Sequence, residues 1–103
     1  MIVDLELENK EIAKQYKELL RISYQTLSDK DKKMIRLAFD TAVDGHRDQR
    51  RKSGEAYIFH PINVAKIVAN QIGLDATSIC AALLHDVIED TRFTLDEIER
   101  LMG

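Results

Sequence analysis

The stretch from Ala81 to Asp90, AALLHDVIED, constrains this chain more than any other part of the sequence. It begins as an apolar segment and ends with a histidine and three carboxylates within six residues. On a helix, residues three and four apart share a face, which places Asp86 beside Glu89 and Asp90, and His85 beside Glu89. Carboxylates that close together repel, and their burial is costly unless positive charge accompanies them. A divalent metal ion bound by imidazole and carboxylate is the simplest such partner.

Apolar residues also recur at three- and four-residue spacing elsewhere, which is the pattern of amphipathic helices. The pattern predicts an all-α fold of about five helices with short connections. The first helix should span residues 8 to about 24, and 103 residues suffice for one small domain. Helices should begin after caps at Ser28, paired with Asp31, and at Asp75, and after a capping box of Thr94 with Glu97. Another helix should begin with His60 at its cap and Pro61 at its first position, and end at Gly73.

Composition narrows the class of protein. A net charge of −3 with 45% apolar residues indicates a globular domain, and neither a nucleic-acid-binding surface nor a disordered acidic tail. The single cysteine, Cys80, excludes an internal disulfide, and its place in SICAALL favours a buried apolar role over a reactive thiol. The sequence shows no signal-peptide pattern and no apolar run near the roughly eighteen residues of a membrane span. We therefore expect a cytoplasmic protein with no membrane partner.

Residues 47–59, RDQRRKSGEAYIF, lose the helical periodicity, and Ser53-Gly54 is a turn signal. This predicted loop presents Arg50, Arg51 and Lys52 either to solvent or to an anion. His46 lies on the apolar stripe before the loop, where a core-edge histidine with a satisfied hydrogen bond is favoured over a role in supporting a site. His60, taken alone, fits a cap or packing role better than a ligand role.

Several catalytic patterns are absent from the sequence. The HExxH motif of zinc proteases, a glycine-rich phosphate loop, a Cys-His metal finger and a local serine nucleophile are all missing. What remains is His60, the His85-Asp86 pair and the Glu89-Asp90 pair, and helical proteins often collect metal ligands from separate helices in this way. A metal there would activate water and polarise a phosphoryl oxygen, and the basic loop would hold negative groups. The combination suggests hydrolysis of a phosphate ester or anhydride.

The segments HRDQRRKSGEAYIFHPINVA and AALLHDVIEDT resemble the hydrolase domain of the RelA/SpoT family, within the HD superfamily of metal-dependent phosphohydrolases. Proteins of that family make and destroy the alarmone (p)ppGpp. The resemblance covers roughly residues 34–103 and is highly specific, although Ala56 stands where the family usually has proline. It implies an HD-domain-like helical bundle that removes the 3′-pyrophosphate of (p)ppGpp to give GDP or GTP and pyrophosphate.

The resemblance also implies roles for individual residues. His60, His85 and Asp86 match three ligands of a Mn²⁺ ion. The acidic pair that positions or activates the attacking water corresponds to Glu89 and Asp90. At the nucleotide, the basic loop would supply an arginine against the guanine and two neighbouring residues. These three positions are Arg51, Lys52 and Ser53.

One departure from the family pattern is substantial. The family's fourth metal ligand is an aspartate on a later helix, the chain ends before that region, and Asp96 is too near His85 in sequence to replace it. We therefore expect a C-terminally incomplete hydrolase domain at 28–103, preceded by a helix within 1–27 that resembles the long family members. Such a chain would be inactive by itself and prone to self-association. The alternative is a helical nucleotide-binding or regulatory module without turnover.

Overall fold

The computed structural model describes residues 4–23, 27–71 and 75–102, and these ranges contain five α-helices and no extended sheet. The all-α prediction is therefore confirmed. None of the helices in these ranges combines the length and apolarity needed to cross a lipid bilayer. The helices are α1 (Leu5–Ser23), α2 (Asp29–Gly45), α3 (Phe59–Ala69), α4 (Ala76–Asp90) and α5 (Leu95–Met102).

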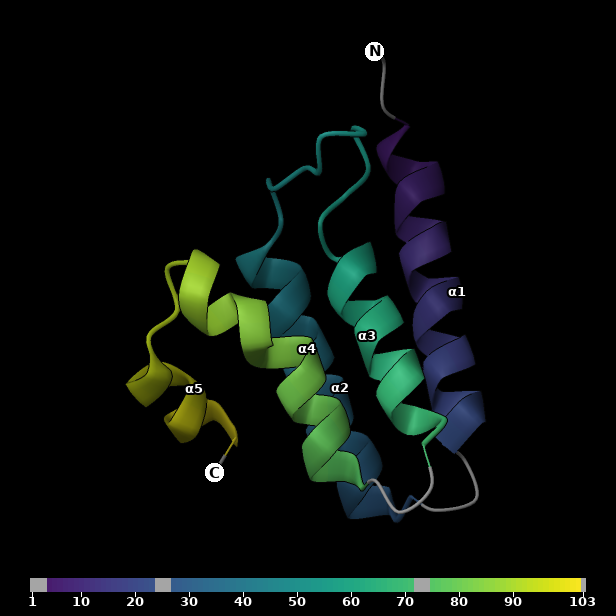
Figure 1. Ribbon diagram of the computed structural model, residues 1–103, viewed down its shortest axis with the longest axis vertical. Helices are drawn as coiled ribbons and strands as arrows, with labels where there is room; N and C mark the ends of the chain where they lie inside the picture. Colours follow the sequence, from purple (N-terminus) through teal and green to yellow (C-terminus); the bar gives the residue numbers. More distant parts are fainter. Residues whose placement is uncertain (1–3, 24–26, 72–74, 103) are drawn as a thin grey trace.

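Helix α4 is the centre of the packing, because its contacts with α2 and with α3 are more extensive than those of any other pair of described helices. Helix α1 lies alongside α3, and α5 contacts α2 at the other edge of the molecule (Figure 1). The side chains of Leu19, Ile35, Ile62, Leu83 and Val87, from four helices, are completely buried in one core. Burial of apolar side chains of this size is the main force holding such a bundle together.

Three of the predicted helix caps are confirmed. The Ser28 hydroxyl accepts from the Asp31 N–H at 3.1 Å, and the Asp31 carboxylate accepts from the Ser28 N–H at 3.2 Å. Asp75 caps α4 by accepting from the Ser78 N–H at 3.1 Å. Before α5, Thr94 and Glu97 accept from each other's N–H groups, both at 3.2 Å. Each cap supplies a partner to an N–H group that the helix leaves unpaired.

Two helix starts differ from the prediction. Helix α1 begins at Leu5, earlier than expected, because the Asp4 carboxylate accepts from the Leu7 N–H at 3.0 Å. Helix α3 begins at Phe59, so His60 and Pro61 occupy its second and third positions instead of the cap and the first position. Proline is tolerated there because the first N–H groups of a helix have no partner within it. The predicted helix ends at residues 24 and 73 lie outside the described ranges.

The segment 46–58 connects α2 to α3 and folds back on itself. The Tyr57 N–H donates to the Gln49 carbonyl at 3.0 Å, and the Arg51 N–H donates to the Glu55 carbonyl at 2.8 Å. Gly54 makes the turn between them with a positive φ of 91°, a conformation that glycine adopts easily. This connecting segment carries the basic residues of the predicted loop.

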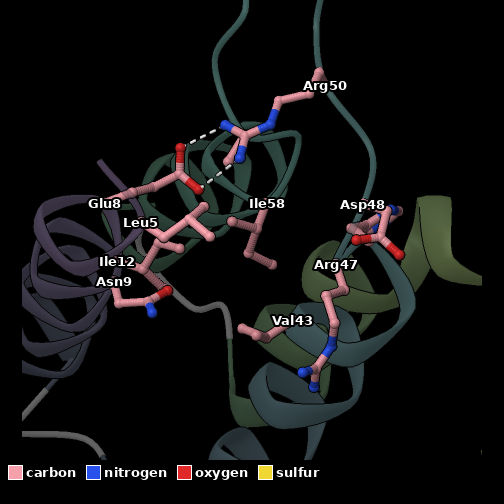
Figure 2. A pocket seen from close by; sticks show the side chains of 11 residues that line it. Leu5, Glu8, Asn9, Ile12, Val43, Arg47, Asp48, Arg50 and Ile58 are labelled. Atoms are coloured by element: carbon pink, nitrogen blue, oxygen red, sulfur yellow. Dashed lines mark hydrogen bonds and ion pairs between the residues drawn. The ribbon is translucent and has the colours of Figure 1, made fainter. Parts of the chain in front are cut away.

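Helix α1 belongs to the same core as the other helices and also holds the connecting segment. Its Tyr16 stacks on Phe39 of α2 with ring centroids 4.2 Å apart. Near its start, both oxygens of Glu8 accept from the Arg50 guanidinium, at 2.5 and 3.0 Å (Figure 2). Division of the chain into residues 1–27 and 28–103 stays a prediction.

Candidate metal centre

Three predicted ligands meet between α3 and α4. His60 projects from the first turn of α3, and its Nε2 lies 3.8 Å from Oδ2 of Asp86 in the second half of α4. The other carboxylate oxygen of Asp86 lies 3.2 Å from Nδ1 of His85. All three side chains line one cavity of about 580 Å³, together with the apolar Val64 and Val68 of α3. The structure therefore brings His60, His85 and Asp86 together although 25 residues separate the first two.

Glu89 lies next to this group, one helical turn beyond His85. Its Oε1 is 4.0 Å from Nε2 of His85, and one ligand atom from each of His85, Asp86 and Glu89 lies within 4.8 Å of the others. Two ligands that bind one ion at about 2.0–2.2 Å are at most about 4.4 Å apart. Small side-chain rotations would therefore allow these oxygen and nitrogen atoms to share a divalent ion. The donor set fits Mn²⁺ in its chemistry, since imidazole and carboxylate both bind such ions.

The two carboxylates of the site carry the negative charge that a cation would neutralise. Partial burial acts to raise the pKa of Asp86, but hydrogen bonds from Tyr57 and His85 outweigh it and hold that pKa below its usual value. The hydrogen bond to Asp86 and the nearby Glu89 raise the pKa of His85 above its usual value. Asp86 is thus held as a carboxylate beside an exposed imidazole and a second acid.

Tyr57 contacts this group directly, and the sequence analysis did not single it out. Its hydroxyl donates to Oδ2 of Asp86 at 2.9 Å, and its ring meets the ring of His60 edge-on at 5.8 Å. Partners that orient ligand side chains in this way matter to metal sites nearly as much as the ligands. The sequence signal was weak, because Tyr57 lies in a non-periodic loop and 29 residues before Asp86.

His46 matches its prediction in part. It is only 2% exposed, and its Nδ1 lies 2.7 Å from Oε1 of Gln49, as expected of a core-edge histidine with a hydrogen bond. Its Nε2 is buried without a partner among the described residues. The ring lies 4.8 Å from the ring of Tyr57, so His46 supports the residue that contacts Asp86.

The predicted substrate residues lie apart from the ligands. Arg51, Lys52 and Ser53 are all exposed in the connecting segment, and none of them lines the cavity of His60 and Asp86. Burial and Asp86 raise the pKa of the Tyr57 hydroxyl, and the Arg51 guanidinium opposes this rise. Arg51 and Tyr57 belong to the same connecting segment.

The last predicted site residue is Asp90, which ends α4 and is exposed. Its backbone carbonyl accepts from Nε2 of Gln49 at 2.8 Å. The side chains of Glu89 and Asp90 are therefore at the solvent-facing end of the helix that carries the ligands.

A second cavity of about 440 Å³ lies between α1, the end of α2 and the connecting segment (Figure 2). Leu5, Glu8 and Ile12 line it from α1, and Val43 and Arg50 line it from the other side. It includes none of the predicted ligands or substrate residues. The candidate metal centre is therefore the cavity between α3 and α4.

Known proteins share the part of the chain that carries these residues. Residues 38–103, which contain every residue of the candidate centre, match the HD domain. The chain is 48% identical over 69 residues to a guanosine-3′,5′-bis(diphosphate) 3′-pyrophosphohydrolase of Aquifex aeolicus, which covers 67% of this chain and 10% of the relative. It is 51% identical over 71 residues to the bifunctional (p)ppGpp synthase/hydrolase SpoT of Escherichia coli, and this match covers 69% of this chain and 10% of that protein.

A GTP pyrophosphokinase of Streptomyces coelicolor is 42% identical over 71 residues, covering 69% of this chain and 8% of that protein. The chain thus spans about a tenth of the length of the curated relatives it matches. These relatives confirm the resemblance to the RelA/SpoT family. Since the matched region is more than half of the chain and includes the His-Asp pair on α4, the chain belongs to the HD domain family.

Proposed function

We propose that this chain carries the metal- and nucleotide-binding part of a (p)ppGpp 3′-pyrophosphohydrolase. Water would be added across the bond to the 3′-pyrophosphate, releasing pyrophosphate and leaving GDP or GTP. The observation that carries the proposal is the meeting of His60, His85 and Asp86 at one cavity. The names of the Aquifex and Escherichia relatives support the choice of substrate.

His60, His85 and Asp86 hold the metal in this proposal. Mn²⁺, when bound, supplies a Lewis acid that polarises a phosphoryl oxygen and makes a bound water more acidic. Tyr57 keeps the Asp86 carboxylate directed toward the cavity through its 2.9 Å hydrogen bond. Glu89 and Asp90 take the role that the family resemblance gives them, orienting the attacking water and accepting its proton, and Glu89 lies 4.0 Å from Nε2 of His85.

The exposed turn of the connecting segment binds the nucleotide. Arg51 places its planar guanidinium against the guanine, a contact in which lysine is a poor substitute. Lys52 and Ser53 lie beside it in sequence and supply a positive charge and a hydroxyl group to the same nucleotide. Arg51 belongs to the same connecting segment as Tyr57, whose hydroxyl contacts Asp86, and this supports a substrate position near the ligand group.

The first experiment measures Mn²⁺ binding to residues 1–103 by the loss of the free-ion signal in electron paramagnetic resonance. We expect binding that His85→Ala abolishes and that Asp96→Ala, the removal of an exposed carboxylate on α5, leaves unchanged. Equal Mn²⁺ binding by the wild-type chain and His85→Ala would contradict the proposed centre.

The second experiment measures pyrophosphate release from ppGpp with excess Mn²⁺. Residues 1–103 supply three of the ligands that the resemblance assigns, so we expect them to bind the ion with negligible turnover. A chain that adds the later aspartate should hydrolyse ppGpp. If that longer chain binds ppGpp and Mn²⁺ but releases no pyrophosphate, the chain is a nucleotide-binding module and not a hydrolase.

A further inference from the structure

Gln49 connects three parts of the molecule that are distant in sequence. Its side-chain oxygen lies 2.7 Å from Nδ1 of His46, at the end of α2. Its side-chain nitrogen donates to the backbone carbonyl of Asp90 at 2.8 Å, across 41 residues. Its own backbone carbonyl accepts from the Tyr57 N–H at 3.0 Å. Gln49 therefore ties α2, the connecting segment and the C-terminal end of α4 together.

The orientation of the Gln49 amide is fixed by chemistry. The Asp90 carbonyl can only accept a hydrogen bond, so the NH₂ group of Gln49 must face it and the oxygen must face His46. The proton of a neutral His46 is then on Nδ1, where it donates to that oxygen. Because His46 is 2% exposed, water does not compete for this bond, and loss of the Gln49 oxygen would leave a buried donor without a partner.

The contact with Asp90 gives a hydrogen-bond donor to a backbone carbonyl at the end of α4. The last carbonyl groups of a helix have no partner within it, and the final turn frays unless something else binds them. In α4 the Thr91 N–H donates to the Val87 carbonyl at 3.2 Å, and the Gln49 side-chain NH₂ donates to the Asp90 carbonyl. The last turn of α4 is thus held by the segment whose Tyr57 also holds Asp86.

We propose that Gln49, held in place by His46, is a positioning residue that fixes the last turn of α4 and with it the acidic side chains of Glu89 and Asp90. The expected effect on Mn²⁺ binding rests on the proposed function. The role of Gln49 in holding the end of α4 rests on its hydrogen bonds alone. Glu89 offers an oxygen within 4.8 Å of ligand atoms of His85 and Asp86, so a looser last turn should weaken Mn²⁺ binding. The loss should not exceed the roughly 10- to 100-fold typical of residues that bond a metal ligand directly.

The test compares Gln49→Met and Gln49→Glu with Gln71→Met, which changes an exposed glutamine after α3. Amide hydrogen exchange should become faster at residues 87–91 in both Gln49 variants and stay unchanged at 76–84. Mn²⁺ affinity should fall in both, with no change in Gln71→Met. Gln49→Glu keeps an oxygen toward His46 but loses the donor toward Asp90. If added charge alone governed the site, this variant would bind Mn²⁺ more tightly.

The outcomes separate the two proposals. Unchanged exchange at 87–91 in both Gln49 variants would overturn the positioning role, and so would tighter Mn²⁺ binding by Gln49→Glu. A wild-type chain that binds no Mn²⁺ would refute the proposed metal centre, while the exchange measurement would still decide whether Gln49 holds the end of α4. Faster exchange together with weaker Mn²⁺ binding supports both.

Discussion

The hydroxyl of Tyr57 and the carboxylate of Asp86 meet at 2.9 Å, and we expect this one bond to set how well the candidate centre binds a cation. Tyr57→Phe keeps the ring against His46 and His60 but removes the hydrogen bond to Oδ2 of Asp86. Mn²⁺ affinity should fall about tenfold, at the lower end of the range for an outer partner. A Mn²⁺ titration followed by electron paramagnetic resonance measures the change.

Tyr16→Phe is the matched control, because Tyr16 stacks on Phe39 of α2 and does not line the cavity between α3 and α4. Its Mn²⁺ affinity should equal that of the wild-type chain. If Tyr57→Phe also bound Mn²⁺ with wild-type affinity, the hydroxyl of Tyr57 would have no part in orienting Asp86.

The thiol of Cys80 gives a second prediction at the scale of a residue. Burial raises its pKa from 9.0 to about 11, so the folded state favours the neutral thiol. The buried neutral thiol contributes fully to the free energy of unfolding below pH 9, and this contribution is lost as the pH rises toward 11. At pH 8 the reactive thiolate should be about a hundredfold scarcer than in the unfolded chain. A thiol-reactive dye should therefore label Cys80 slowly in buffer and rapidly in denaturant, and equal rates would show that Cys80 is accessible.

At the scale of an element, the start of α4 depends on Asp75. The carboxylate accepts from the Ser78 N–H at 3.1 Å and from the Ser78 hydroxyl at 3.3 Å. Loss of a helix cap costs about 1 kcal/mol, so Asp75→Ala should lower the free energy of unfolding in urea by about that amount. Thr77→Ala removes an exposed side chain from the same turn and should change it far less. Similar losses in both variants would mean that the cap contributes nothing.

The helix caps were predictable because each depends on residues three apart in sequence. The start of α3 was not, because the Phe59 and His60 N–H groups donate to the Ala56 and Tyr57 carbonyls, and this turn of the loop runs on into the helix. The motif in the sequence predicted the candidate ligands, but it did not predict the residues that hold them in place. Tyr57 and Gln49 act across 29 and 41 residues from a loop without periodicity.

At the scale of the whole molecule, a large apolar side chain remains exposed on a helix that carries a candidate ligand. Ile67 of α3 is 62% exposed, and Val64 and Val68 of the same helix line the cavity of the candidate centre. Exposed apolar surface of this kind favours self-association. We expect residues 1–103 to associate at high concentration in sedimentation-velocity experiments, and Ile67→Lys should shift the distribution toward the monomer.

Leu7 of α1 is similarly exposed, at 65%, but lies on a helix that carries none of the candidate ligands. Leu7→Lys adds the same charge and should leave the association unchanged. If both variants suppressed association equally, net charge would be responsible and not the surface of α3.

The position of the candidate ligands on two different helices has a thermodynamic consequence. His60 belongs to α3 and Asp86 to α4, so an ion bound by both would act as a cross-link between the two helices. The unfolded chain offers no such preformed site, so metal binding and folding are linked equilibria. At a free Mn²⁺ concentration one hundred times the dissociation constant, the folded state should gain about 2.7 kcal/mol. A chelator would then weaken the whole fold, and the melting temperature of this small bundle would report the concentration of its metal.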